Sequence, residues 1–128
     1  MSLKAQLQIM VVDDMATSRA LIEQAMDEIG FLHVDYQSDP TTAYGMLAAR
    51  PMHLVISDYN MPGMSGLQLL AALRGFQATQ RIGFILVSGR LDQNIIAEGQ
   101  KYALNNFIQK PFSTLQMRNC IEKVVGRL

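Results

Sequence analysis

Two apolar runs are the features that constrain the fold most. Neither shows the alternation of apolar and polar residues that is typical of a strand with one exposed face. Leu7–Val12 reads LQIMVV and Ile82–Val87 reads IGFILV. Such runs are typical of strands that are covered on both faces. Strands of that kind occur in parallel sheets with helices packed on each side. The two runs therefore predict an α/β fold.

The rest of the chain alternates between short strand candidates and stretches with helical spacing. Besides the two apolar runs, we expect strands at His33–Gln37, Leu54–Ser57 and Asn106–Gln109. The expected helices span Thr17–Ile29, Asp39 or Pro40 to Ala49, Gly66–Arg74, Asp92–Tyr102, and Ser113 or Thr114 to Val125. This order predicts a doubly wound, five-stranded parallel sheet flanked by five helices, folded as one domain over residues 1–128.

Composition narrows the classes of partner and the compartment. Of the 128 residues 49 % are hydrophobic, which favours a globular domain, and 11 basic and 11 acidic residues cancel in charge. Nothing in this balance indicates nucleic acid or an anionic membrane as a partner. Cys120 is the only cysteine, which excludes an internal disulfide and fits a reducing compartment. With no apolar run of roughly 18 residues and no signal-peptide pattern, we expect a soluble, cytoplasmic protein.

Polar side chains follow four of the expected strands at their carboxyl ends. Asp13 and Asp14 follow the first strand, Asp58 the third, Ser88 the fourth and Lys110 the fifth. In doubly wound sheets the functional crevice lies at these ends, at a switch point in strand order. Each residue alone has an ordinary explanation, such as a helix cap, a turn or a solvated side chain. Their combination at successive strand ends indicates a site.

Three carboxylates close together repel one another unless a proton or a cation compensates their charge. Oxygen ligands with no His or Cys nearby favour Mg²⁺ over zinc. A carboxylate can also act as a nucleophile on phosphorus and form an aspartyl phosphate, and an ammonium beside it would stabilise the transferred group. The pattern therefore predicts a Mg²⁺ and phosphoryl site, with Ser88 as a hydrogen-bond donor to the phosphoryl group.

Four motifs hold the polar residues at the strand ends, namely VVDD at 11–14, SDYNMPGMSG at 57–66, VSG at 87–89 and FIQKPF at 107–112. Together they resemble the receiver domains of two-component response regulators, and among these the single-domain chemotaxis type. The resemblance covers essentially the whole chain. It implies a five-stranded parallel sheet flanked by five helices and a phosphorylation-driven switch that catalyses only its own phosphorylation and dephosphorylation.

The resemblance also implies a role for each site residue. Asp58 would accept a phosphoryl group from a phosphohistidine of a sensor histidine kinase. The same Asp58, Asp13 and Asp14 would hold Mg²⁺, with Asp14 the more direct ligand of the pair, and Asn60 would add its backbone carbonyl. Ser88 would move toward the phosphoryl group.

The lysine of the family corresponds to Lys110, which would pair with the phosphoryl group. Its bond to Pro111 is usually cis in the family, and we predict a cis bond here. The loop at 60–66 would curl around the metal, with Gly63 and Gly66 supplying backbone freedom.

Three residues depart from the family pattern. Phe107 stands where the switch aromatic is usually Tyr, so it can rotate but lacks a hydroxyl for a partner. Arg90 lies two residues after Ser88, where it could reach the phosphoryl group or block the attacking water. Ala103 replaces the usual Gly after the fourth helix, and because Ala tolerates positive φ poorly, we expect Asn105 and Asn106 to make that turn.

The sequence leaves the output open. With no DNA-binding segment in the chain, output should come from protein contact, and the resemblance suggests the flagellar motor switch as the target of a mostly monomeric protein. A phosphate sink or a phosphorelay intermediate for the same kinase would share the chemistry without binding the motor. A phosphatase of the haloacid dehalogenase type is disfavoured, because Asn60 stands where its general acid would be and 128 residues leave no room for a cap domain.

Overall fold

The computed structural model describes every residue except Met1 and Leu91, and it contains a sheet of five parallel strands in the order β2-β1-β3-β4-β5. The strands are β1 (Gln8–Val12), β2 (His33–Gln37), β3 (Leu54–Asp58), β4 (Gly83–Ser88) and β5 (Asn106–Gln109). The predicted doubly wound topology is confirmed. Its strand order reverses beside β1 and β3, so the carboxyl ends of these two strands mark the switch point.

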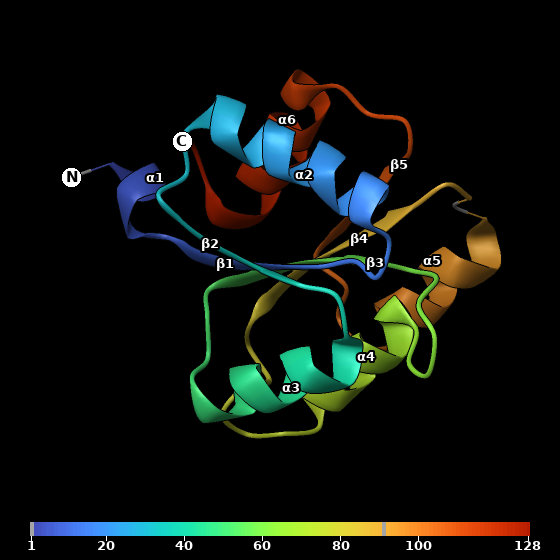
Figure 1. Cartoon of the computed structure of the whole chain (residues 1–128). Coiled ribbons are helices and arrows are strands. Elements are labelled where there is room, and N and C mark those ends of the chain that lie inside the picture. The colour runs from blue at the N-terminus through green and yellow to red at the C-terminus, as the bar shows by residue number, and fades with distance from the viewer. Residues whose placement is uncertain (1, 91) are drawn as a thin grey trace.

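Helices cover both faces of the sheet (Figure 1). In chain order they are α1 (Leu3–Gln6), α2 (Ala16–Ile29), α3 (Pro40–Ala49), α4 (Gly66–Arg74), α5 (Gln93–Gln100) and α6 (Thr114–Val125). α2 and α6 pack on one face, and α3 and α4 on the other. Each pair buries its own apolar cluster against the strands, as sheets that are apolar on both faces require.

The described residues form six helices and not the five that we expected, because the short helix α1 precedes the first strand. Leu3 packs against the apolar cluster under α2, and Leu7 N–H donates to the Leu3 carbonyl at 3.0 Å. A helix of four residues is too short to show helical periodicity in a sequence. Its stability comes from packing, which the sequence does not display.

Most element boundaries agree with the prediction to within a residue or two, and two differences matter. β3 continues through Asp58, so this carboxylate belongs to the strand itself. α5 ends at Gln100, short of the predicted Tyr102, and Asp92 serves as its N-cap by accepting from Ile95 N–H at 2.9 Å.

The turn between α5 and β5 is built differently from the expectation. Ala103 itself takes the left-handed conformation, with φ 53°, so Asn105 and Asn106 do not make the turn. Leu104 N–H donates to the Gly99 carbonyl at 3.0 Å and closes the helix end. The Asn105 side chain instead accepts from Phe84 N–H at 2.8 Å and ties the turn to β4.

The guanidinium of Arg74 explains how an alanine is held in this conformation. Arg74 ends α4 and donates five hydrogen bonds of 2.7–3.1 Å, which satisfy every direction of its planar group. Its acceptors are the carbonyls of Gln80, Ile82, Tyr102 and Ala103 and the side-chain oxygen of Asn105. We call Arg74 and these acceptors the arginine clamp.

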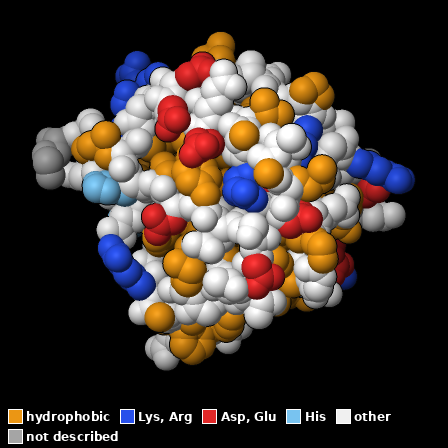
Figure 2. Space-filling view, viewed as in Figure 1, with side chains coloured by type: hydrophobic (Ala, Val, Ile, Leu, Met, Phe, Trp, Pro, Cys, Tyr) orange, Lys and Arg blue, Asp and Glu red, His pale blue; other side chains and the backbone are white. Residues whose placement is uncertain are grey.

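On the face that Figure 2 shows, acidic and basic side chains are interspersed, and no patch of one sign stands out. No described helix is long and apolar enough to cross a membrane.

Candidate functional site

Asp58 is fixed at the carboxyl end of the central strand β3. The next residue, Tyr59, donates its N–H to the Val87 carbonyl of β4 at 2.9 Å, so pairing with β4 continues past the carboxylate. Only 5 % of Asp58 is exposed. The strand therefore delivers a rigid, nearly buried carboxylate to the sheet edge.

The loop after Asp58 turns back tightly toward the strand. Gly66 N–H donates to the Tyr59 carbonyl at 2.9 Å, and a Cβ on Gly66 would collide with the backbone oxygen of Asp58. Gly63 has φ +80°, a conformation that favours glycine. Ser65 then starts α4 with a capping box to Gln68. The predicted backbone freedom is confirmed at Gly63. Gly66 has no positive φ and is needed for another reason, because the Asp58 carbonyl lies too close for any Cβ.

Asp13, Asp14 and Asp58 form an acidic cluster at the ends of β1 and β3. One carboxylate oxygen from each lies within 4.8 Å of the others. Asp13 is fully buried, and its Oδ1 accepts from Met15 N–H at 3.0 Å. Oδ2 of Asp13 and Oδ1 of Asp14 are buried and have no hydrogen-bond partner among the described residues. The residues thus fit a hard cation, because unpartnered carboxylate oxygens at one point are the donor set that Mg²⁺ takes.

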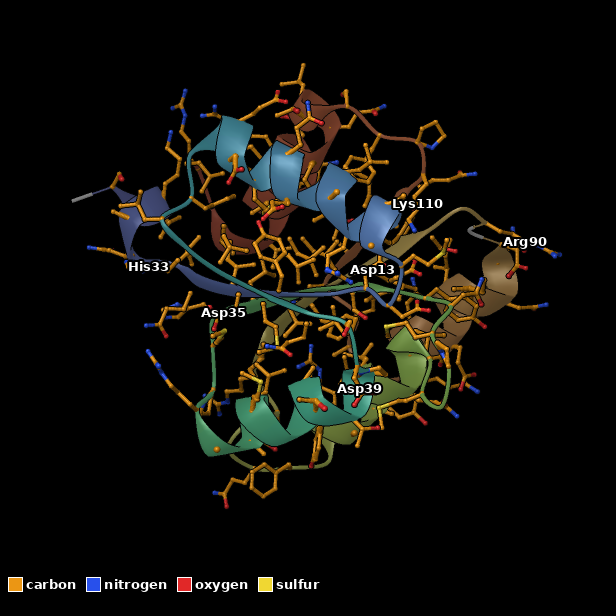
Figure 3. All side chains as sticks on the ribbon, in the orientation of Figure 1. Asp13, His33, Asp35, Asp39, Arg90 and Lys110 are labelled. Atoms are coloured by element: carbon orange, nitrogen blue, oxygen red, sulfur yellow. The ribbon has the colours of Figure 1, made fainter. Side chains whose placement is uncertain are left out.

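Lys110 brings a positive charge to this acidic cluster from the end of β5. Its Nζ lies 3.0 Å from Oδ1 of Asp58 and 3.8 Å from Oδ2 of Asp13. Figure 3 shows Lys110 and Asp13 close together at this edge of the sheet. The Lys110–Pro111 peptide bond is cis, as predicted.

The pKa of the Asp58 carboxyl is raised above its ordinary value. Burial is the largest cause, and the negative charge of Asp13 acts in the same direction, while the hydrogen bond and the charge of Lys110 partly oppose them. One ammonium therefore does not fully compensate the acidic cluster. The remaining negative charge favours binding of a cation.

Ser88 ends β4 close to Asp58 but uses its hydroxyl locally. Oγ donates to the Arg90 carbonyl at 2.8 Å and accepts from Arg90 N–H at 3.1 Å. The Arg90 side chain is 86 % exposed and forms an ion pair of 3.5 Å with Asp92. It lies farther out than Lys110 in Figure 3. To bind a phosphoryl group, the Ser88 hydroxyl would have to give up its hydrogen bond to the Arg90 carbonyl.

Two further predicted residues lie on the loop after β3 and on β5. Asn60 is exposed in the loop, two residues beyond Asp58. Phe107 on β5 is 38 % exposed and borders a groove of about 670 Å³ whose other walls include Ile96 and Lys123. The outward position leaves Phe107 room to rotate.

Ser18 belongs to the site and was missed by the sequence analysis. It lies in the first turn of α2, and its Oγ accepts a hydrogen bond of 2.6 Å from Lys110 Nζ. No local signal marked it, because the contact that gives Ser18 its place joins it to a residue 92 positions away in the chain. A serine there was indistinguishable from an ordinary residue of a helix start.

Comparison with known proteins finds relatives of the whole chain. A profile of the response regulator receiver domain family matches residues 9–122. A probable chemotaxis protein CheY of Rhizobium etli is 34 % identical over 128 residues, which cover 100 % of this chain and 99 % of that protein.

Solved structures share the fold at lower identity. Chemotaxis protein CheY4 of Vibrio cholerae has a TM-score of 0.85 at 20 % identity and covers 92 % of this chain and 98 % of its own. A receiver domain of a Pseudomonas aeruginosa sensor histidine kinase, with a magnesium ion coordinated in its active-site cleft, has a TM-score of 0.83 at 17 % identity. That match covers 94 % of this chain and 98 % of the other.

Proposed function

The chain belongs to the response regulator receiver domain family, and on that premise we propose that Asp58 accepts a phosphoryl group from a phosphohistidine of a sensor histidine kinase. The observation that carries the proposal is the position of Asp58. It is the strand-end carboxylate that both joins the acidic cluster and lies 3.0 Å from the Lys110 ammonium. Receiver domains of the CheY kind act as regulators and are not classical enzymes.

The transfer needs a nucleophile and charge compensation, and this chain offers both. An oxygen of Asp58 attacks phosphorus, an O–P bond forms, and the N–P bond to the kinase histidine breaks, with the electron pair returning to the imidazole. Lys110 can move its hydrogen bond from the carboxylate to a phosphoryl oxygen without leaving the site. Ser88 would give up the Arg90 carbonyl and donate to another phosphoryl oxygen.

Asp13, Asp14 and Asp58, with the backbone carbonyl of Asn60, would hold Mg²⁺. When bound, the ion would compensate the carboxylates and the charge of the incoming phosphoryl group. Support comes from the two unpartnered oxygens of Asp13 and Asp14. We expect phosphoryl uptake to require Mg²⁺.

For the output we propose that phosphorylation shifts a pre-existing equilibrium of the face formed by α5, β5 and α6. Phe107 would be the moving side chain, and the flagellar motor switch protein would be the target of a cytoplasmic, monomeric regulator. The 34 % identical relative of Rhizobium etli, a probable chemotaxis protein, supports a chemotaxis role. The missing hydroxyl of Phe107 favours a second candidate, a phosphate sink or relay that exchanges phosphoryl groups with the kinase and does not bind the motor.

The decisive experiment measures Mg²⁺-dependent transfer from a phosphorylated kinase domain, followed by decay of the phosphoprotein. We expect uptake with Mg²⁺, none with a chelator, and a loss of about 10³-fold or more in the variant Asp58→Asn. Asp39→Asn is the matched control, because Asp39 is an exposed N-cap outside the acidic cluster and Asn still caps. Normal uptake by Asp58→Asn would overturn the site.

The lifetime of the phosphoprotein then separates the two outputs. Decay over many minutes would favour a messenger that reaches a distant target. Decay within seconds would leave both outputs open, and binding of the phosphorylated protein to the motor switch protein would decide between them.

A further inference from the structure

The contact between Ser18 and Lys110 has no counterpart in the motifs that identify the site. Among the described residues, Lys110 Nζ has three oxygen partners, namely Ser18 Oγ at 2.6 Å, Asp58 Oδ1 at 3.0 Å and Asp13 Oδ2 at 3.8 Å. An ammonium carries three N–H donors. The shortest of the three contacts is the one to the uncharged serine, although both other neighbours are carboxylates.

Two of these three neighbours change their chemical state when the site works. Asp58 loses its carboxylate charge when it becomes an acyl phosphate, and Asp13 is engaged by the cation when one is bound. The Ser18 hydroxyl changes in neither event. It is therefore the one neighbour of the ammonium that remains the same before, during and after phosphoryl transfer.

Without the hydrogen bond to Ser18, the Lys110 side chain could move into a neighbouring groove. The contact borders a groove of about 560 Å³ between α2 and the start of α6, lined in part by Leu21, Ala25 and Phe112. The Lys110 side chain is 28 % exposed. Long lysine side chains lose considerable rotamer entropy when fixed, so an ammonium with only changing partners would sample the water in this groove.

We infer that Ser18 is a positioning residue that holds the Lys110 ammonium at the phosphorylation site throughout the phosphorylation cycle. The inference rests on the proposed function of Asp58 and Lys110, and it adds a residue outside the four motifs. Ser18 acts through Lys110 and does not itself touch the phosphoryl group. Its place in the first turn of a long helix makes it a rigid support, because α2 packs on the sheet through Ile22, Ala25 and Met26.

The test compares Ser18→Ala with Ser18→Thr, which keeps the hydroxyl, and with Thr17→Ala, which removes an exposed hydroxyl from the same turn. The probe is phosphoramidate, a small donor that bypasses kinase docking, at saturating Mg²⁺. Loss of one charge-assisted hydrogen bond should slow phosphorylation of Ser18→Ala by about tenfold. Mg²⁺ affinity should stay the same, because the acidic cluster is intact. Ser18→Thr should recover most of the rate, and Thr17→Ala should match the unmodified protein.

A second readout follows the ammonium directly, by ¹⁵N relaxation of the Lys110 Nζ group in the unphosphorylated protein. We expect an ordered ammonium in the unmodified protein and in Ser18→Thr, and a mobile one in Ser18→Ala. Equal mobility in all three proteins, or a normal phosphorylation rate in Ser18→Ala, would overturn the inference. If the unmodified protein takes up no phosphoryl group, the proposed function fails, and the relaxation comparison still decides whether Ser18 orders Lys110.

Discussion

Two polar clusters lie at opposite ends of the sheet, and they differ in how well their hydrogen-bonding groups are satisfied. At the carboxyl ends, the acidic cluster has two buried oxygens without a hydrogen-bond partner among the described residues and one ammonium for three carboxylates. At the amino ends of β4 and β5, the arginine clamp gives one guanidinium five acceptors.

This difference distinguishes a polar cluster that binds a ligand from one that only stabilises the fold. Buried polar groups in folded proteins nearly always have partners, so an unpartnered oxygen requires an explanation. Repulsion within the acidic cluster works against folding, and binding of a cation and a phosphoryl group would relieve it. The arginine clamp has nothing left to bind, and its hydrogen bonds contribute only to stability.

The strongest way to break this contrast is to remove the arginine clamp by Arg74→Met. Five acceptors would lose their donor, and we expect the free energy of unfolding to fall by about 3 kcal/mol, with water replacing the guanidinium at the more exposed acceptors. Urea denaturation with an unchanged slope would measure this loss. The folded fraction should still be phosphorylated, because the clamp lies at the other end of the sheet.

Arg81→Met is the matched control, since Arg81 is exposed in the loop before β4 and its side chain makes no hydrogen bond or ion pair with the described residues. Its effect should stay within about 0.5 kcal/mol. An equal loss in both variants would mean that the clamp contributes nothing beyond general surface charge.

The same contrast explains what the sequence could and could not reveal. Asp13, Asp58 and Lys110 were predictable, because strand periodicity places each at a strand end and parallel strands bring those ends together. The clamp was not, because Arg74 binds backbone carbonyls up to 29 residues away, and backbone carbonyls leave no mark in a sequence.

Errors at Ala103 and Ser18 have the same origin. The conformation of Ala103 is decided by the distant Arg74, so local propensity gave the wrong turn. The role of Ser18 depends on Lys110, which is 92 residues away in the chain. Contacts that join residues far apart in the chain, at least one of which belongs to no motif, could therefore not be predicted from the sequence.

Removing the charge of Asp58 tests the acidic cluster in the same way, through the free energy of unfolding. Because burial raises the pKa of this carboxyl in the folded protein above its ordinary value of 3.8, the neutral form favours folding. That contribution is present below the ordinary pKa and is lost as pH rises through the raised one. At pH 7 without divalent cations, Asp58→Asn should therefore be more stable than the unmodified protein, by about 1 kcal/mol.

Thermal unfolding in chelator should show this advantage at pH 7 and its disappearance below the ordinary pKa of the carboxyl, where Asp58 is neutral in both states. Saturating Mg²⁺ should also reduce it, since we expect the cation to bind more tightly to the protein that keeps all three carboxylates. A variant less stable than the unmodified protein at pH 7 would show that the ion pair with Lys110 outweighs burial.

A smaller effect probes what the arginine clamp holds. Ala103 has φ 53°, a conformation that is costly for alanine and free for glycine. Ala103→Gly should raise the free energy of unfolding by about 0.5–1 kcal/mol, after the greater entropy of glycine in the unfolded chain is subtracted. Ala78→Gly, in an exposed turn without positive φ, should lower it by a similar amount. A loss of stability in both variants would mean that Ala103 is not strained.

The smallest expected effect concerns Arg90, which lies two residues after Ser88 and outside the acidic cluster. Its guanidinium is 86 % exposed and paired with Asp92 at 3.5 Å, so it can leave this pair at little cost. Once Asp58 carries a phosphoryl group, the added negative charge would attract Arg90 and place it in the path of attacking water. Arg90→Ala should then speed decay of the phosphoprotein by about two- to threefold. Arg90→Lys separates charge from shape, because a compact ammonium keeps the attraction and covers less of the phosphoryl group. An unchanged decay rate in Arg90→Ala would confine Arg90 to its pair with Asp92 and leave the lifetime to the groups that already contact Asp58.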